Sequence, residues 1–458
     1  MTEVPVKIGQ EVALEIANYG HEGEGVGRFQ NFTVFVPGVL RGERVKAQIV
    51  EVRKNFARGR AIAILKAASE RRTPECPIYA ECGGCQLQHL DYPAQLQLKR
   101  EQVVNAVERI GGLTGVTIRP TLGMDRPRQY RNKLQYPFGL REGAVVVGCF
   151  RQGTHQIVPV GECLIQHPLH NRVLDTLREL VIEHRVPIYD ERSGKGLLRH
   201  VLLKNGFTSG EAMVVLVTNG ERFLEGQAIA AQLAAAHPAI KSVVQNINRT
   251  RGNVILGREN RTLWGKDRIV EELDGLKFRI SANAFFQVNP QQTVKLYQKA
   301  VEYAALAGSE RVVDAYCGVG SLTLFLARRA AAVFGIEVVP EAIRDARENA
   351  ALNGLGNVQF LVGETETVLP RLVHEGHRFD VAVVDPPRAG CAESVLETLA
   401  AVEVERIVYV SCNPSTLARD LRRLAELGYE TREIQPVDMF PQTYHVECIA
   451  RIVMNVKG

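Results

Sequence analysis

Residues 407–414 are Ile-Val-Tyr-Val-Ser-Cys-Asn-Pro, a run of β-branched and aromatic residues that ends in a cysteine and an Asn-Pro turn signal. Such a run predicts a buried β-strand, and the turn places Cys412 at the carboxyl end of that strand. Open α/β sheets bind their ligands at this edge. A free cysteine is more often an inert core residue than a nucleophile, so the surrounding motifs must decide the role of Cys412.

A strand, a glycine-rich turn and a helix are predicted over residues 311–327. Gly318 and Gly320 in this turn let the backbone come close to a ligand at the start of the helix. Glu337 ends the next predicted strand, where an acidic side chain would accept hydrogen bonds from ribose hydroxyls. The third glycine of a dinucleotide-binding turn is absent, so the pattern predicts a nucleoside cofactor without pyrophosphate, S-adenosylmethionine.

A further predicted strand ends in Asp-Pro-Pro-Arg at residues 385–388, where the two prolines would fix the carboxylate of Asp385. Methyltransferases that act on amino groups often have an aromatic residue after Asp-Pro-Pro, which stacks on the base. Arg388 occupies that place here. This departure disfavours methylation of nitrogen and is compatible with methylation of carbon.

Methylation at carbon 5 of a pyrimidine requires a nucleophile and a base. Carbon 5 becomes reactive only after a thiolate adds to carbon 6, and a base must then remove the carbon 5 proton. Cys412 would supply the thiolate, and Glu447, near the start of the last predicted strand, would supply the base. An ordinary thiol pKa of roughly 8.5 leaves little thiolate at neutral pH, so local lowering or substrate assistance is implied. Without Cys412, Glu447 would be interpreted as a surface carboxylate.

Residues 1–66 carry short alternating apolar runs separated by glycine-containing turns, which predicts a small OB-like β-barrel. Basic residues interleave with these runs and would form either a solvated strand face or an RNA phosphate-binding face. The segments Gly-Glu-Gly-Val-Gly-Arg (23–28) and Val-Phe-Val-Pro-Gly (34–38) resemble the TRAM domain, an RNA-binding β-barrel of RNA-modifying enzymes.

Cys76, Cys82 and Cys85 lie within ten residues, and the glycines at 83 and 84 allow the backbone to curl around one centre. A fourth soft ligand would come from Cys163, which has a glycine nearby, although spacing alone does not exclude Cys149. Four thiolates suit an iron-sulfur cluster or zinc, and thiols without a metal are the remaining alternative.

The chain has 458 residues, a net charge of +5 and nine cysteines, and it contains no run of eighteen uncharged apolar residues. This length predicts two or three domains. The odd cysteine count favours reduced thiols, and we expect a cytoplasmic protein without membrane association. Nothing in the sequence calls for an obligate protein partner.

Five motifs together resemble the RNA uracil-5-methyltransferase family, and with the TRAM-like start and the cysteines the resemblance covers nearly the whole chain. It implies that Cys412 is the nucleophile and Glu447 the base. The motifs are Phe-Phe-Gln-Val-Asn (285–289), Asp-Ala-Tyr-Cys-Gly-Val-Gly (314–320), Asp-Pro-Pro-Arg-Ala-Gly (385–390), Ser-Cys-Asn-Pro (411–414) and the stretch from Met439 to Glu447. The residues implied around S-adenosylmethionine and the flipped base are Gln287, Tyr316, Glu337 and Asp385. The ligands implied for a [4Fe-4S] cluster are Cys76, Cys82, Cys85 and Cys163.

The expected architecture is multidomain. Residues 1–66 would form the TRAM-like barrel, 67–92 with 126–276 an α+β central domain that carries the iron-sulfur cluster and binds RNA, and 93–125 with 277–458 an α/β Rossmann-like methyltransferase domain. The assignment of 93–125 to the catalytic domain follows from the family resemblance.

Within the resembled family, tRNA-specific bacterial members lack both barrel and cluster. The sequence therefore predicts methylation of a flipped loop uridine in 23S ribosomal RNA. Three alternatives remain: a tRNA uridine methyltransferase with the same chemistry, a cytosine-C5 enzyme, and an RNA-binding assembly factor without activity. The presence of both Cys412 and Glu447 argues against the inactive factor.

Overall fold

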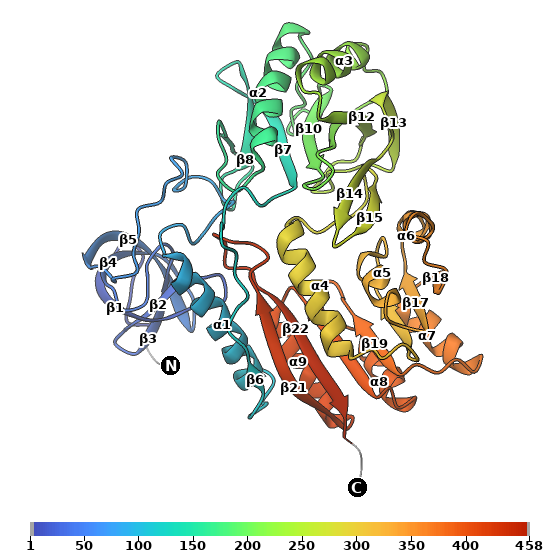
Figure 1. The fold of residues 1–458 in the computed structure, drawn as a ribbon. Coiled ribbons are helices and arrows are strands. Elements are labelled where there is room, and N and C mark those ends of the chain that lie inside the picture. Colours follow the sequence, from blue (N-terminus) through green and yellow to red (C-terminus); the bar gives the residue numbers. More distant parts are fainter. Residues whose placement is uncertain (1–3, 456–458) are drawn as a thin grey trace.

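The computed structural model describes residues 4–455, which form a closed barrel, a seven-stranded sheet, a two-stranded sheet and an eight-stranded sheet (Figure 1). In Figure 1 the blue barrel lies to the left of the yellow, orange and red catalytic part, and the green central part lies above both. No helix in residues 4–455 is long and apolar enough to cross a membrane.

The closed barrel confirms the predicted N-terminal fold. Its strand order is β1-β2-β3-β5-β4. The segment of β2 had no strand prediction because Gly25 and Gly27 lower strand propensity. Both glycines are required by packing, since a Cβ at Gly25 would lie 2.5 Å from Val39 and one at Gly27 would lie 3.0 Å from the Glu15 carbonyl oxygen. The barrel strands are β1 (Glu11–Tyr19), β2 (Gly25–Phe29), β3 (Phe32–Val36), β4 (Arg44–Val52) and β5 (Phe56–Lys66).

The central sheet has the order β13-β12-β11-β10-β7-β8-β9 and is covered by α2 (Pro168–Glu183) and α3 (Gly226–Ala236). The strands β10 and β11 are buried along their whole length. Its strands are β7 (Lys133–Arg141), β8 (Ala144–Phe150), β9 (Ile157–Pro159), β10 (Leu198–Asn205), β11 (Ala212–Thr218), β12 (Ile240–Ile247) and β13 (Glu259–Gly265); β14 (Ile269–Leu273) and β15 (Leu276–Ile280) form a hairpin toward the catalytic sheet.

The eight-stranded sheet has the order β18-β17-β16-β19-β20-β22-β21-β6, a methyltransferase fold as the sequence predicts. The chain moves outward from β16 to β18 and then returns to the other side with β19, so the strand order reverses between β16 and β19. Ligands of open α/β sheets bind at such a reversal, beyond the carboxyl ends of the strands. The strands are β6 (Thr117–Ile118), β16 (Arg311–Ala315), β17 (Ala332–Glu337), β18 (Val358–Val362), β19 (Val381–Val384), β20 (Arg406–Ser411), β21 (Tyr429–Val437) and β22 (Glu447–Met454).

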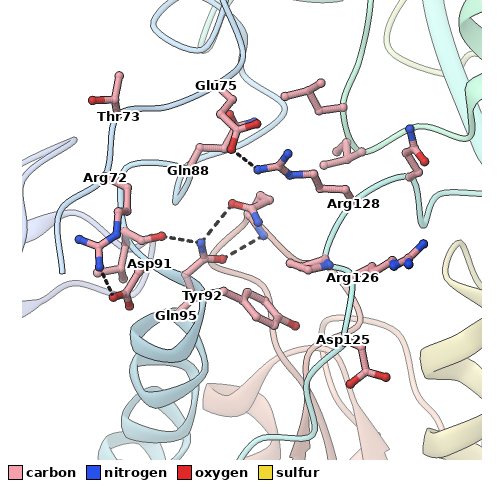
Figure 2. Close-up of a pocket in the computed structure, with 16 residues that line it drawn as sticks. Arg72, Thr73, Glu75, Gln88, Asp91, Tyr92, Gln95, Asp125, Arg126 and Arg128 are labelled. Atoms are coloured by element: carbon pink, nitrogen blue, oxygen red, sulfur yellow. Dashed lines mark hydrogen bonds and ion pairs between the residues drawn. The ribbon is translucent and has the colours of Figure 1, made fainter.

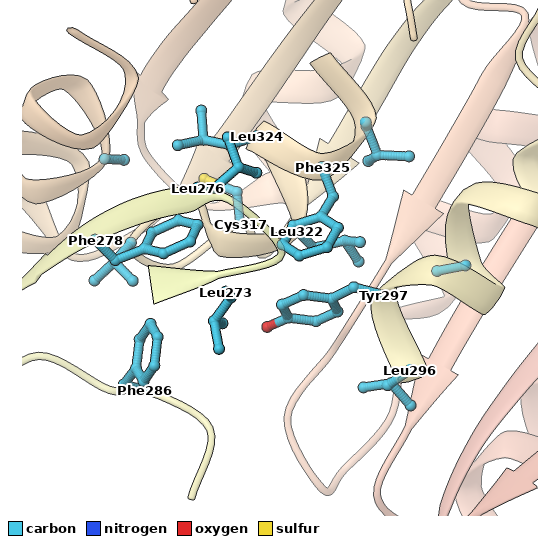
Figure 3. Packing of buried hydrophobic residues seen from close by; sticks show 14 of the residues in the cluster. Leu273, Leu276, Phe278, Phe286, Leu296, Tyr297, Cys317, Leu322, Leu324 and Phe325 are labelled. Atoms are coloured by element: carbon cyan, nitrogen blue, oxygen red, sulfur yellow. The ribbon is translucent and has the colours of Figure 1, made fainter. Parts of the chain in front are cut away.

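One apolar core underlies the glycine-rich turn, where Tyr297, Phe325 and Leu322 pack against Cys317 and the β14–β15 hairpin (Figure 3). The Tyr297 and Phe325 rings meet edge to face with centroids 5.2 Å apart. The helices around this sheet are α4 (Pro290–Ala304), α5 (Ser321–Ala327), α6 (Pro340–Leu352), α7 (Thr365–His374), α8 (Glu393–Ala401) and α9 (Pro414–Glu426).

The segment after the cysteine-rich region joins the catalytic sheet. Helix α1 (Tyr92–Arg109) begins at Asp91, whose side chain accepts a hydrogen bond from the Ala94 amide, and Pro93 suits the first turn. The short strand β6 then pairs in parallel with β21. The predicted domain boundaries at residues 66, 92, 125 and 276 stay a prediction.

Candidate active site

Four of the residues predicted for the site lie at the carboxyl ends of parallel strands of one sheet. Tyr316 follows β16, Glu337 ends β17, Asp385 follows β19 and Cys412 follows β20. Because these strands are parallel neighbours in the order β17-β16-β19-β20, their ends meet along one edge. The side chains therefore face a common region around the reversal of the strand order.

Glu447 reaches the same edge from the opposite chain direction, because β22 runs antiparallel to β20. Ser411 of β20 pairs with Cys448 of β22, and one residue further along lie Cys412 and Glu447. Residues directly opposite each other on antiparallel strands have Cβ atoms roughly 5 Å apart. The sheet thus brings Cys412 and Glu447 side by side.

Burial changes the acidity of both groups. Glu447 is 4% exposed, and burial together with the charge of Asp385 raises its pKa to about 8, while Arg388 opposes this shift. Cys412 is half-buried, and burial, followed by the charges of Glu447 and Asp385, raises its pKa to about 11. At neutral pH Cys412 is therefore a thiol beside the mostly protonated carboxyl group of Glu447.

Two further carboxyl groups underlie the site. Burial raises the pKa of Asp385 to about 7, and burial also raises that of Asp314 to about 7. The Asp314 carboxylate accepts a hydrogen bond from the Thr323 hydroxyl at 2.5 Å, and this bond joins β16 to α5. A cation bound beside these carboxyl groups would favour their charged forms and lower their pKa, so the region suits a positively charged cofactor.

The glycine-rich turn is shaped by backbone in the left-handed region. Tyr316, Gly318 and Gly320 have φ values of 68°, 56° and 79°. This conformation is uncommon for tyrosine, and such backbone persists where the surroundings hold it, often at functional sites. The Tyr316 hydroxyl donates to the Glu366 carboxylate at 3.3 Å, and burial raises the pKa of Tyr316.

The residues at this turn fit a bound nucleoside. A Cβ added at Gly318 would meet nothing within 4 Å, so the space over the turn is open. Glu337 accepts hydrogen bonds from the amides of Gly318 (3.1 Å) and Val339 (2.9 Å), which hold its carboxylate at the turn. Val338 and Val339, directly after Glu337, are exposed apolar side chains against which an adenine ring can pack.

Gln287 lies on the segment between β15 and α4. The Asn132 side-chain amide donates to the Gln287 carbonyl oxygen at 3.0 Å, and Asn289 donates to the Met439 carbonyl oxygen at 3.1 Å. These bonds place the segment beside the chain that leads to Glu447. Within residues 4–455, no hydrogen bond joins the Gln287 side chain to the other predicted site residues.

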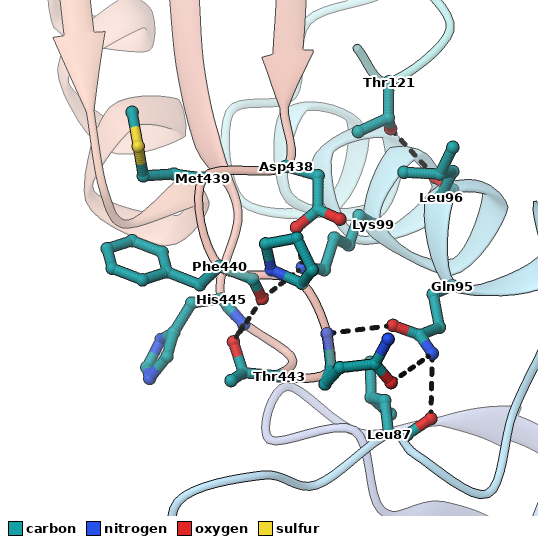
Figure 4. Close-up of polar contacts among 12 residues, drawn as sticks. Leu87, Gln95, Leu96, Lys99, Thr121, Asp438, Met439, Phe440, Thr443 and His445 are labelled. Atoms are coloured by element: carbon teal, nitrogen blue, oxygen red, sulfur yellow. Dashed lines mark hydrogen bonds and ion pairs between the residues drawn. The ribbon is translucent and has the colours of Figure 1, made fainter. Parts of the chain in front are cut away.

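Residues 438–446, here called the β21–β22 loop, carry the chain into Glu447 and are held by distant elements (Figure 4). Lys99 of α1 binds the Asp438 carboxylate and donates to the Phe440 carbonyl oxygen at 3.0 Å. The amides of Gln86 and Leu87 both donate to the Gln442 carbonyl oxygen, at 3.0 and 2.9 Å. Sequence reasoning missed these supports because no local pattern links α1 or the cysteine-rich segment to residue 438.

A pocket of about 570 Å³ adjoins the β21–β22 loop through Gln442 (Figure 2). Two ion pairs cross it, one between Arg128 and Glu75 and one between Arg72 and Asp91. Cys412 and Glu447 do not line it. The pocket thus lies between the segment that follows the barrel, the start of α1 and the residues around Arg128, and it is separate from Cys412 and Glu447.

The predicted cluster cysteines are close enough to affect one another. Burial raises the pKa of Cys85 to about 12, and the charges of Cys163, Cys82 and Cys76 act in the same direction. Cys149 also belongs to this neighbourhood, because its hydrogen bond lowers the pKa of Cys82 to about 6. The choice between Cys163 and Cys149 as the fourth ligand stays a prediction.

These sulfurs do not converge on a single ion. Within residues 4–455, no group of three or more His, Cys, Asp or Glu side chains is arranged to hold one metal ion. A zinc site would bring four sulfurs to about 2.3 Å from one centre, which this arrangement lacks. An iron-sulfur cluster spreads its thiolates over several iron atoms, and an all-sulfur donor set by itself suits either a cluster or zinc.

Comparisons with known proteins bear on the whole chain. A family model described as tRNA (uracil-5-)-methyltransferase matches residues 197–454, and a TRAM domain model matches residues 5–62. An uncharacterized RNA methyltransferase of Halalkalibacterium halodurans is 48% identical over 456 residues, covering 100% of this chain and 99% of its own. One from Bacillus cereus is 47% identical over 446 residues, covering 97% of each chain.

A solved structure is similar over nearly the same length. It is the tRNA (uracil-54, C5)-methyltransferase of Pyrococcus abyssi in complex with S-adenosyl-L-homocysteine, with a TM-score of 0.78 and 29% identity. The similarity covers 96% of this chain and 100% of that one. A match of this extent includes most of the barrel as well as the catalytic sheet.

Proposed function

Because this chain belongs to the RNA (uracil-5-)-methyltransferase family, which acts with S-adenosylmethionine, we propose that it methylates carbon 5 of a flipped loop uridine in 23S ribosomal RNA. The observation that carries the proposal is the position of Cys412 beside Glu447 on adjacent strands, at the edge where the sheet binds ligands. A carbon-directed reaction needs this nucleophile and base together.

Cys412 would act as the nucleophile. Its sulfur adds to carbon 6 of the uracil, and the electron pair of the 5,6 double bond moves toward carbon 5 and the carbonyl group. The carbon 5 position then accepts the methyl group. Since burial and the neighbouring carboxylates raise the pKa of Cys412 to about 11, the thiol must pass its proton to solvent before the sulfur adds to carbon 6.

Glu447 would act as the base in the second half of the reaction. It takes the proton from carbon 5, the double bond re-forms, and Cys412 leaves carbon 6 as the thiolate. A pKa of about 8 makes Glu447 a stronger base than an ordinary carboxylate once it is deprotonated. Cys412 is then a thiolate again, and Glu447 passes its proton to solvent before another turnover.

Asp385, Tyr316, Glu337 and Gln287 would hold the cofactor and the flipped base. S-adenosylmethionine supplies an electrophilic methyl group and a positive charge when bound. A cation beside Asp385 lowers the pKa of Cys412 and Glu447, because the carboxylate that raises both is then neutralised. Glu337, already held at the glycine-rich turn by two amides, suits the ribose hydroxyls.

A [4Fe-4S] cluster bound by Cys76, Cys82, Cys85 and Cys163 is part of the same proposal. Its support is the mutual influence of these thiols and the soft, all-sulfur donor set. The amides of Gln86 and Leu87, directly after Cys85, hold the loop that leads to Glu447. The cluster would therefore act structurally, by ordering this segment. A cytoplasmic location stays a prediction.

A tRNA uridine is the second candidate target, and one observation favours it. The Pyrococcus abyssi protein is a tRNA enzyme and matches nearly the whole of this chain, so the presence of a barrel does not by itself indicate ribosomal RNA. Methyl transfer to transcribed 23S fragments and to transcribed tRNA, measured with labelled S-adenosylmethionine, separates the two. We expect 5-methyluridine in the ribosomal fragment, and label in tRNA alone would overturn that choice.

A further inference from the structure

A second pocket, of about 790 Å³, lies in the central domain at the end of β7 away from the catalytic sheet. The amino end of β7 adjoins the segment that carries Gln287, because the amide of Asn132, directly before β7, donates to the Val288 carbonyl oxygen at 2.9 Å. Arg141, at the other end of β7, lines the pocket. A strand rise of roughly 3.4 Å per residue puts Pro137, the first pocket residue on β7, about 14 Å from Lys133 and puts Arg141 about 27 Å from it, and none of the candidate active-site residues lines the pocket. The pocket is therefore distinct from the candidate active site.

Aromatic and apolar side chains form part of its wall. The rings of Phe150 and His155 lie with centroids 5.2 Å apart at an interplanar angle of 34°. Leu140, also in the lining, is 62% exposed. A planar ring entering the pocket would find rings to stack on and apolar surface to cover.

Arg199 gives the pocket a buried charge. It is 4% exposed, its guanidinium packs over the Tyr189 ring at 4.6 Å, and it donates to the carbonyl oxygens of Asn248 and Thr250 at 2.6 and 2.8 Å. No carboxylate in residues 4–455 forms an ion pair with it, and its Nε is buried without a hydrogen-bond partner. Buried charges are normally paired, so this arginine lacks an anion.

The remaining charged groups of the lining are two arginines and three carboxylates. Arg141 and Arg192 are exposed and form no ion pair within the described residues. Two of the three carboxylates in the lining are already engaged, since Asp190 accepts from the Ser193 amide at 2.7 Å and Glu191 contacts His155 at 2.8 Å. Glu142 is the third. With Arg199 the lining holds three arginines and three carboxylates, so its formal charges balance, and the three arginines form no ion pair within the described residues.

A neutral polar group completes the lining. His200 is 7% exposed, and its Nδ1 is buried without a partner. Burial, with the nearby charge of Arg199, lowers the pKa of His200 to about 4, so its ring is uncharged at neutral pH. An uncharged imidazole nitrogen can donate to or accept from the edge of a base.

We propose that this pocket binds an unpaired nucleotide of the RNA substrate, with its base against Phe150 and His155 and its phosphate near Arg192 and Arg199. The inference rests on the proposed function, because it adds a second contact to the same RNA. Stacking rings beside arginines are the means by which proteins bind single-stranded RNA. The distance from the active site means that the contact holds a neighbouring part of the folded RNA and leaves the reacting uridine free.

Two substitutions test the contact without removing buried Arg199. Phe150→Ala removes a stacking face, and Arg192→Glu reverses an exposed charge; Arg178→Glu on α2 is a matched reversal outside the pocket. With the full-length protein and a 23S fragment that it methylates, we expect each pocket variant to raise the Kd for RNA about tenfold. The value of kcat at saturating RNA should stay unchanged, and Arg178→Glu should bind within twofold of wild type. Pocket variants that bind like the control would overturn the inference.

Crosslinking locates the contact independently of the variants. RNA that contains 4-thiouridine should crosslink to the peptides that hold Phe150, His155 or Tyr189, and crosslinks found only in the barrel and the catalytic sheet would refute the pocket. AMP and inorganic phosphate serve as probes of a free-nucleotide site. If AMP binds the pocket tightly and the substitutions leave the Kd for RNA unchanged, the assignment of the pocket to RNA is wrong.

The outcomes separate this inference from the proposed function. A wild-type protein that makes 5-methyluridine but does not use the pocket would refute only the inference. A protein that crosslinks through the pocket but makes no 5-methyluridine in any RNA would refute only the proposed function.

Discussion

Lys99 and Asp438 form an ion pair in which neither side chain has exposed surface, although 339 residues separate them in the chain. The pair joins α1 to the start of the β21–β22 loop (Figure 4). The Tyr92 hydroxyl donates to the other Asp438 oxygen at 2.8 Å. The position of Glu447 at the end of this loop thus depends on a helix from the first quarter of the chain.

Replacing Lys99 by Met should destabilise the protein. The substitution leaves the Asp438 carboxylate buried without a cation, which costs about 3–5 kcal/mol of unfolding free energy. Denaturant unfolding measures this loss, and Lys99→Met with Asp438→Leu should recover part of it, because no lone charge remains. Arg422→Met is the control, since its pair with Glu426 is exposed and contributes about 0–1 kcal/mol. A Lys99→Met protein as stable as wild type would contradict the importance of the pair.

Replacing Cys412 by Ala should abolish covalent attachment to RNA. RNA with 5-fluorouridine at the target traps the wild-type adduct, because fluorine at carbon 5 cannot be removed as a proton. Denaturing gels should show this adduct for wild type and for Cys391→Ala, which removes another thiol near the same sheet. Cys412→Ala should bind RNA within about twofold of wild type without an adduct. Methyl transfer by Cys412→Ala would remove Cys412 as the nucleophile.

Replacing Glu447 by Gln should stop the reaction after methylation. The amide cannot take the carbon 5 proton, so a methylated protein–RNA adduct should accumulate on unmodified uridine RNA. Mass spectrometry of the adduct should show one added methyl group. Free 5-methyluridine product at the wild-type rate would exclude Glu447 as the base.

The reaction should accelerate with pH. Burial and Asp385 raise the pKa of Glu447 to about 8 and that of Cys412 to about 11, and both groups act in their deprotonated forms. We therefore expect kcat/KM to rise between pH 6 and 9. Asp385→Asn removes a charge that raises both pKa values, so the profile of kcat/KM for S-adenosylmethionine, which reports the enzyme before the cofactor binds, should shift to lower pH.

Asp380 provides the control for this profile. It lies at the amino end of β19, where its carboxylate accepts from the Arg311 amide at 2.8 Å, whereas Asp385 follows the carboxyl end of the same strand. Asp380→Asn should leave the pH dependence unchanged. A profile that is flat, or that shifts equally in both variants, would contradict the electrostatic coupling of Asp385 to Cys412 and Glu447.

Anaerobic purification should yield four iron and four sulfide per chain. Cys163→Ala should lose most of this iron, whereas Cys149→Ala should retain it, because Cys163 is the proposed fourth ligand. The two variants form a matched pair, since both thiols lie in the same neighbourhood. If only Cys149→Ala loses iron, Cys149 is the fourth ligand and Cys163 is not. Stoichiometric zinc without iron would reject the cluster.

Local patterns predicted most of the elements. The runs before Tyr316, Glu337, Asp385 and Cys412 are strands, and the glycine-rich turn after the first of them leads into α5, as predicted. These predictions succeed because a strand's apolar run and the turn after it are adjacent in the sequence. Strand β2 was missed because its glycines are selected by packing inside the barrel, where a side chain would clash.

The sequence by itself determined which residue types stand at strand ends: a thiol, several carboxylates and a glycine-rich turn. Only the tertiary structure decided that Glu447 lies beside Cys412, because β22 inserts antiparallel between β20 and β21. It also decided that Lys99 supports the loop before Glu447 and that Cys149 approaches Cys82. Pairing between distant segments depends on how whole surfaces fit together, and a local run of residues does not indicate which distant segment it will pair with.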